Sequence, residues 1–243
     1  MNWSKVKTIA IIAFLIINIY LVFRLYSQIP MTSIIPDTQI KKAIAILNKN
    51  GIAIKCKIPN EIYSVSKLNV MVESSFQDII KKLFGNRIDK YKNEYQSSLY
   101  YIKIENGVLH LTSTYDINPF ELLEINQNNY YKDPILNQYI QIYKGIFLFD
   151  GKMIVSKKDN GVQITFSKIK PLTFELDKKR TISSTEAIFN LLNQSKNIKT
   201  IQDIKFGYYQ KDLNIIKGEA LPVWRIIADN QVFYINAFSG WLE

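Results

Sequence analysis

The stretch PVWRIIADNQVFYINAFSGWLE (Pro222–Glu243) has the pattern of a β-hairpin rich in aromatic residues, and the prediction of the fold starts from it. Apolar and aromatic residues flank Asp229–Asn230 on both sides, and we take this pair as a two-residue turn. This turn predicts two apolar cross-strand pairs on one side of the sheet: Ile226 with Phe233, and Trp224 with Ile235. Such pairs join a sheet to a layer of helices. We therefore predict that these four residues form the structural core of the hairpin.

The other side of the same hairpin places Arg225 opposite Tyr234, an arrangement that favours a cation–π contact. Gly240 favours a further turn in the closing segment. Two interpretations of the aromatic residues stay open. They form a core and lid, or they form a patch that binds a ligand.

Outward from this hairpin, helical and strand patterns alternate, which predicts an α+β fold of antiparallel sheets with packed helices. Four segments have the period and the end signals of helices: 36–51, 74–85, 133–145 and 183–194. Strand patterns lie between them, with hairpin turns expected at Asn106–Gly107, Asp150–Gly151 and Asn160–Gly161.

Two of these helices begin alike, with SSFQDI from Ser74 and SSTEAI from Ser183. Each start has the spacing of a capping box, with a glutamine or glutamate three residues after the serine. We interpret this likeness as a hypothesis of internal duplication. The first α+β sub-domain would span 37–118, and the second would span 133–243 and end in the hairpin.

The N-terminal segment Val6–Tyr26 is predominantly apolar. About 20 such residues, at about 1.5 Å per residue, cross a bilayer core of about 30 Å. We predict a cytoplasmic tip and transmembrane anchor at 1–27 and a linker at 28–36. Lysines precede the apolar run and only Arg24 follows it closely, so we expect the amino end in the cytoplasm and the later residues outside.

A cleaved signal peptide is the competing interpretation, but RLYSQIPMTS offers no convincing small-x-small site. Asn18 is an amide in the middle of the predicted span. It is either a tolerated polar residue or a hydrogen-bonding contact to a neighbouring transmembrane helix, worth about 1 kcal/mol. A membrane partner that contacts Asn18 is therefore a hypothesis.

The net charge and the single cysteine limit which kinds of ligand and metal site the chain can have. The formal net charge is +10, from 31 Lys and Arg against 21 Asp and Glu, and it is spread along the chain. This predicts attraction to anionic surfaces and no nucleic-acid groove. The one cysteine, Cys56, forms no internal disulfide and fits no zinc spacing, and we interpret it as a packing residue.

Residues suited to catalysis are scarce. The only histidine, His110, is placed beside Lys103 by the register of the Asn106–Gly107 hairpin. Neither G-x-x-x-x-G-K-[ST] nor G-x-G-x-x-G occurs. We therefore expect no enzyme activity, no catalytic residues, no metal site and no cofactor.

The segment YINAFSG resembles the close of PepSY-type modules, with Asn236 and Ser239 where that pattern has Asp and Thr. Combined with the start MNWSKVKTIAIIAFLIINIYLVF, this ending is similar to the YycI (WalI) family. The resemblance is clearest over the first 25 or so residues and the last 25. In between it rests on length and α+β alternation.

The resemblance implies a single-pass membrane regulator in a low-GC Gram-positive bacterium. Members of that family accompany an essential sensor histidine kinase that governs cell-wall metabolism, and they pair with a sister membrane protein, YycH. The resemblance thus implies both proteins as partners and signal transduction through a two-component regulatory system. The alternative is an anchored extracytoplasmic module that binds a wall polymer or a peptide ligand.

Overall fold

The computed structural model describes residues 3–27, 33–85, 93–158, 161–195 and 197–243. Its helices are α1 (Trp3–Ser27), α2 (Asp37–Lys49), α3 (Gln77–Phe84), α4 (Pro119–Leu122) and α5 (Ser184–Gln194), with a 3-10 turn η1 (Gln127–Asn129). The strands are β1 (Ser33–Ile34), β2 (Ala53–Ile54), β3 (Glu61–Ile62), β4 (Ser64–Val65), β5 (Leu68–Val72), β6 (Glu94–Gln96), β7 (Tyr100–Glu105), β8 (Val108–Ser113), β9 (Tyr130–Asp133), β10 (Gln138–Tyr143), β11 (Ile146–Lys158), β12 (Gly161–Ser167), β13 (Ile169–Phe174), β14 (Lys179–Arg180), β15 (Thr200–Tyr209), β16 (Lys217–Ala228) and β17 (Gln231–Asn236).

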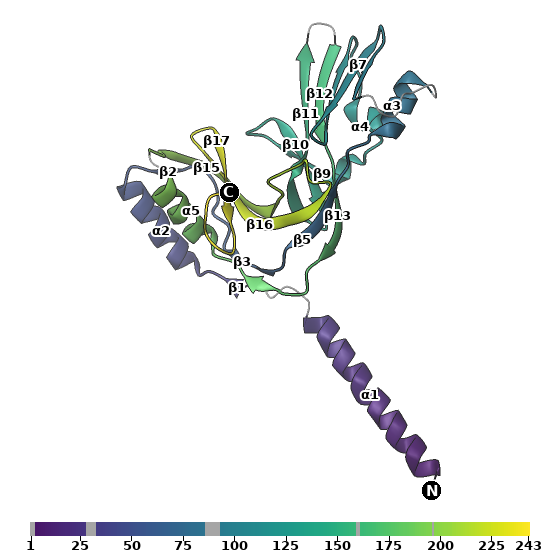
Figure 1. Cartoon of the computed structure of the whole chain (residues 1–243). Coiled ribbons are helices and arrows are strands. Elements are labelled where there is room, and N and C mark those ends of the chain that lie inside the picture. Colours follow the sequence, from purple (N-terminus) through teal and green to yellow (C-terminus); the bar gives the residue numbers. More distant parts are fainter. Residues whose placement is uncertain (1–2, 28–32, 86–92, 159–160, 196) are drawn as a thin grey trace.

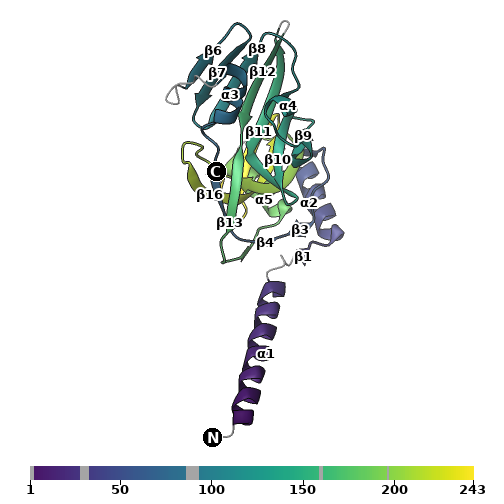
Figure 2. The same cartoon turned by 90° about the vertical axis from the view of Figure 1, so that its right-hand side faces the viewer.

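Most strands join one 13-stranded sheet, with the order β13-β5-β16-β15-β11-β12-β8-β7-β6 and with β2, β9, β10 and β17 attached to it. Its pairings are antiparallel except for β11 with β15 and β2 with β15, which are parallel. The hairpins β7–β8 and β11–β12 extend at the end of the molecule opposite α1 (Figures 1 and 2). The fold is therefore α+β and mostly antiparallel.

Two main cores support this sheet. Helices α2 and α5 lie side by side in Figure 1, and their buried faces pack against β15, β16 and β17 around Trp224. Helix α3 and the region of α4 pack against β7, β8, β11 and β12 around Phe166. Each helix thus buries one apolar stripe against a sheet face, as amphipathic helices do.

Strands from the two predicted sub-domains, 37–118 and 133–243, are interleaved in this sheet. Strand β5 pairs with β13 and β16, β8 pairs with β12, and β2 pairs with β15. The core around Trp224 likewise joins α2 to α5. The internal duplication therefore stays a prediction. The strands of 37–118 and of 133–243 together form one continuous sheet.

The predicted helix at 133–145 is wrong, because this segment forms the hairpin β9–β10. The Asp133 carboxylate accepts the backbone N–H groups of Ile135 and Leu136, at 3.0 and 3.2 Å, and so starts a turn. The following QYIQIY is rich in isoleucine and tyrosine, residue types that favour a strand.

The predicted turn at Asp150–Gly151 is also wrong, since β11 runs through it. The register against β10 shifts there, from Ile140 opposite Lys152 to Gln141 opposite Leu148. A Cβ at position 151 would lie 2.3 Å from the Gln141 side chain, so glycine is needed for close packing and not for a turn. The turn expected at Asn160–Gly161 lies partly outside the described residues.

The hairpin turn at Asn106–Gly107 has the expected register, with Ile104 opposite Leu109 and Lys103 opposite His110. Both turn residues have positive φ, 52° and 71°, as a two-residue turn of this kind requires.

Helix α1 stands apart from the sheet in both views (Figures 1 and 2). Its described side chains are exposed, including Ile11, Phe14 and Ile17. Within the part of the chain that the structure describes, no helix combines the length and the apolarity that crossing a membrane requires. The predicted linker at 28–36 lies partly outside the described residues, and β1 occupies two of its later positions.

Candidate functional site

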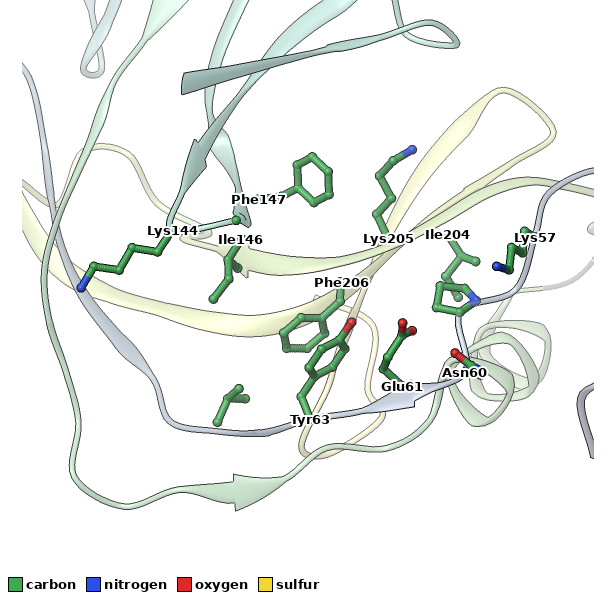
Figure 3. A pocket seen from close by; sticks show the side chains of 13 residues that line it. Lys57, Asn60, Glu61, Tyr63, Lys144, Ile146, Phe147, Ile204, Lys205 and Phe206 are labelled. Atoms are coloured by element: carbon green, nitrogen blue, oxygen red, sulfur yellow. The ribbon is translucent and has the colours of Figure 1, made fainter. Parts of the chain in front are cut away.

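A groove of about 540 Å³ lies between the sheet and the segment that leads into β4 (Figure 3). One wall comes from residues 57–65, and the opposite wall comes from β15 and the turn between β10 and β11. Its main lining side chains are Lys57, Glu61, Tyr63, Lys144, Phe147, Lys205 and Phe206. We call this concave surface the lysine groove.

Aromatic rings give the lysine groove a rigid floor. The Tyr63 and Phe206 rings stack with centroids 4.2 Å apart, and Phe206 packs edge-on against Trp224 at 5.3 Å. The indole N–H of Trp224 donates to the carbonyl of Ile182 at 3.0 Å, which fixes that ring. Burial, with a contribution from Glu61, raises the pKa of Tyr63 to about 12, so its hydroxyl stays neutral. The floor therefore offers apolar ring faces and one hydroxyl.

The charged side chains of the groove are mostly positive. Lys57 and Lys144 are exposed, and Glu61 is the acidic residue among the lining side chains. Lys205 is less exposed, forms an ion pair with Asp203 and lies over the Tyr131 ring at 5.1 Å. In Figure 3 the three lysines lie at separate places around the groove. This arrangement favours an anionic ligand that also carries apolar groups.

A buried charge cluster lies behind Lys205. The Nη2 atom of Arg225 is 2.6 Å from an Asp133 oxygen and 2.8 Å from an Asp203 oxygen. Its guanidinium also lies 5.1 Å from the centroid of the Phe149 ring. The Nε and Nη1 atoms of Arg225 are buried without a hydrogen-bond partner among the described residues. Asp203 therefore connects a buried cation to a cation at the groove.

Asp133 is ionised in this cluster. Burial acts to raise its pKa, but the Arg225 charge and hydrogen bonds from Arg225, Leu136 and Ile135 together hold the pKa below its usual range. The sequence prediction missed Asp133 and Asp203 as partners of Arg225. The sequence does contain an indication of such partners, which is the arginine within the apolar run VWRIIA. An arginine in so apolar a strand is expected to be buried, and a buried charge is paired with an opposite charge.

A second buried carboxylate, Asp150, lies in the bulge of β11. One of its oxygens accepts the Gln210 backbone N–H at 2.6 Å. Burial raises its pKa to about 7, while that hydrogen bond and the Lys152 charge act in the opposite direction. Burial raises the pKa values of Tyr209 and Tyr234, whose rings stack 4.1 Å apart, and the charge of Asp150 acts in the same direction.

The residues singled out in the terminal hairpin lie in the core near this groove. The register pairs Trp224 with Ile235 and Ile226 with Phe233, as the two-residue turn at 229–230 requires. Trp224, Ile226 and Ile235 are fully buried, and Phe233 packs against them. Arg225 is opposite Tyr234 in the register, but its cation–π contact is with Phe149.

The remaining predicted residues lie elsewhere. The Asn18 side-chain amide donates to the carbonyl of Phe14 within α1, at 2.9 Å. The His110 Nδ1 atom lies 3.4 Å from the Thr165 hydroxyl on the β8–β12 sheet. Cys56 is half-buried, and burial raises its pKa to about 11. Among the described residues, no three His, Cys, Asp or Glu side chains are grouped as a metal site.

Comparison with known proteins gives one family. The model of the YycI protein family matches residues 32–238. No curated protein matches the chain. Among solved structures, a crystal structure of an uncharacterized protein from Eubacterium rectale ATCC 33656 is 11% identical, with a TM-score of 0.39 over 79% of this chain and 89% of that one. Because the family model matches most of the chain, the chain belongs to the YycI family.

Proposed function

We propose that this chain is a single-pass membrane protein that modulates a sensor histidine kinase controlling cell-wall metabolism, by forming a complex with the kinase and a YycH-like sister protein. Membership in the YycI family, which implies a regulatory role in the YycFG two-component system, carries this proposal. YycI proteins are a regulatory family and are not known as enzymes.

The proposed anchor is α1, with its amino end in the cytoplasm and the sheet domain outside. The exposed apolar side chains of this helix support the proposal, because apolar surface of this extent is stable when covered by lipid or another helix. Its N-terminal charges, Lys5 and Lys7, support the orientation.

The test is recovery of partners from native membranes in mild detergent. The full-length chain is compared with a variant that lacks residues 1–30. Recovery of the kinase or the sister protein with the full-length chain alone supports a complex held through the anchor. Recovery with both places a contact in the sheet domain. Recovery with neither contradicts the proposal.

Asn18→Leu refines the same test. The Asn18 amide uses one N–H within α1, which leaves its second N–H and its oxygen for a neighbouring helix. We expect the leucine variant to stay in the membrane and to recover less partner than the unchanged chain. Equal recovery removes Asn18 from the contact.

A second candidate function is favoured by the lysine groove. An anchored extracytoplasmic module that binds a wall polymer or a peptide would need a concave surface with apolar and cationic side chains, which this groove provides. Affinity of the purified chain for such a ligand, falling as salt rises, would support this candidate.

A further inference from the structure

Strand β15 has one edge that is only partly covered. Along its first edge it pairs with β16 from Ile201 to Tyr209. Along the other edge it pairs with β2 at Thr200 and Ile201, and with β11 at Gly207 and Tyr208. Between them, residues 202–206 have no strand partner on this edge within the described chain. At about 3.3 Å per residue, the uncovered edge is about 16 Å long.

This uncovered edge lies in the lysine groove. Ile204, Lys205 and Phe206 of β15 are among the lining residues, with Phe147 and residues 57–61 at the two ends of the gap. An uncovered strand edge presents backbone donors and acceptors that an extended chain can pair with. The neighbouring rings of Phe147, Phe206 and Tyr63 suit the alternate apolar side chains of such a chain.

We propose that the lysine groove binds an extended acidic peptide segment of a partner protein, which adds to the sheet beside residues 202–206 of β15. Lys205 is paired with Asp203, but Lys57 and Lys144 are opposed by Glu61 alone among the lining residues, so the groove favours acidic side chains on the segment. The open strand edge favours a peptide over a sugar or polyol phosphate polymer, because such a polymer has no main-chain amides to pair with a strand. This site is additional to the proposed regulatory complex and does not depend on it.

The first experiment measures peptide binding by the full-length chain in detergent micelles. The probe is a fluorescein-labelled ten-residue peptide that alternates glutamate with valine and has one central phenylalanine, and the measurement is fluorescence anisotropy. We expect saturable binding that weakens about tenfold in the double variant Lys57→Glu with Lys144→Glu, since both lysines are exposed at the groove.

The matched control is Lys41→Glu with Lys42→Glu, which makes the same change in net charge on the exposed face of α2. We expect the control to bind the probe as the unchanged chain does, and circular dichroism verifies that both variants are folded. An equal loss in both double variants would mean attraction by overall charge, and it would overturn the site.

The second experiment tests the strand pairing. Two further probes carry N-methyl groups on alternate residues, one on the odd positions and one on the even positions. Because only one set of amides faces β15, we expect one probe to bind as the parent does and the other to lose at least tenfold in affinity. Equal binding of both overturns the strand-addition part of the proposal.

A poly(glycerol phosphate) chain serves as the competing ligand. If it binds at the groove lysines while the acidic peptide does not bind at millimolar concentration, the groove is a polymer site and the peptide proposal is wrong. Binding of the peptide or of the polymer does not affect the recovery of the kinase or the sister protein from membranes. The peptide site and the regulatory complex can therefore be contradicted independently of each other.

Discussion

Arg225 shows how one residue connects the core to the surface of the groove. It lies on β16 between two fully buried side chains, Trp224 and Ile226, where a charge is stable only if it is paired. Asp133 and Asp203 provide the two carboxylates from β9 and β15. Lys205 shares Asp203, so a ligand that binds this lysine also changes the surroundings of the buried cluster.

Substitution of Arg225 should therefore strongly destabilise the folded chain. In Arg225→Ala, Asp133 stays fully buried without its cation, and we expect the free energy of unfolding to fall by about 3–5 kcal/mol. The control is Lys205→Ala, in which Asp203 keeps Arg225 as a partner, and we expect a loss of about 1 kcal/mol or less. Chemical denaturation of the chain in detergent measures both. Losses of equal size would contradict the central role of Arg225.

The Asp150 carboxyl makes stability depend on pH in a stated direction. Its pKa is about 7 in the folded chain, above its ordinary value of 3.8. The folded chain therefore binds the proton more tightly between these values, and this group lowers the free energy of unfolding as the pH rises from about 4 to 7. Below that window both states are protonated, and the contribution is absent.

Asp150→Asn isolates this effect. The asparagine oxygen can still accept the Gln210 N–H, but the side chain carries no charge. At pH 8 we expect the variant to be more stable than the unchanged chain, by on the order of 3 kcal/mol, and at pH 4 we expect the two to be similar. Denaturation curves across this range provide the measurement. A difference that is constant with pH would show that Asp150 does not titrate in this window.

At the scale of elements, the starts of α3 and α5 differ although their sequences are alike. At α5 the Ser183 hydroxyl accepts the Glu186 N–H at 3.2 Å, and the Glu186 carboxylate accepts the Ser183 N–H at 2.7 Å. This is the predicted capping box. At α3 the residue before the helix is Phe76, with φ of 43° and no side-chain cap, because its ring is buried against Phe166. The capping box predicted from SSFQDI is therefore absent at α3, where burial of the Phe76 ring sets the start of the helix instead.

A matched pair of substitutions measures this difference. Ser183→Ala should lower the free energy of unfolding by about 1–2 kcal/mol, since alanine lacks the hydroxyl that accepts the Glu186 N–H and donates to the Glu186 carboxylate. Ser74→Ala should change it by less than about 0.5 kcal/mol, because Ser74 is exposed and caps no helix. A comparable loss at Ser74 would mean that the serine caps α3 in solution.

The closing segment of the hairpin has its own local support. The Asn236 side-chain oxygen accepts the backbone N–H groups of Phe238 and Ser239, at 2.9 and 3.1 Å. An aspartate at this position, as in the PepSY pattern, would accept the same two bonds. The amide therefore suits the turn, while the PepSY-like relationship stays a prediction.

At the scale of the whole molecule, α1 and the sheet domain are separate parts of the chain. Helix α1 has 25 residues, and at about 1.5 Å per residue it is about 37 Å long. The lysine groove and the Arg225 cluster belong wholly to the sheet domain.

The proposed orientation can be tested by labelling intact cells with a membrane-impermeant maleimide. In a Cys56→Ser background, Leu176→Cys places a thiol at a position that is 87% exposed. We expect Leu176→Cys to be labelled in intact cells, and Asn2→Cys to be labelled only after the cells are made permeable. The opposite pattern would reverse the orientation, and labelling of both in intact cells would contradict the anchor.

Several local features of the fold could be predicted from the sequence alone. The turns at Asn106–Gly107 and Asp229–Asn230 set the registers of their hairpins, and Ser183 with Glu186 set the start of α5. These features were predictable because a two-residue turn or a cap acts over a few neighbouring residues. The family that the resemblance predicted is confirmed by the match over residues 32–238, a range that begins after the N-terminal segment.

The candidate site, in contrast, depends on the tertiary structure. It joined Arg225 to Asp133 and Asp203, made a strand of the segment 138–143, and left an edge of β15 open between β2 and β11. Each of these depends on which distant strands pair and on how their side chains pack together. No local pattern encodes that choice, because the stabilisation comes from burial and charge pairing between segments far apart in the chain.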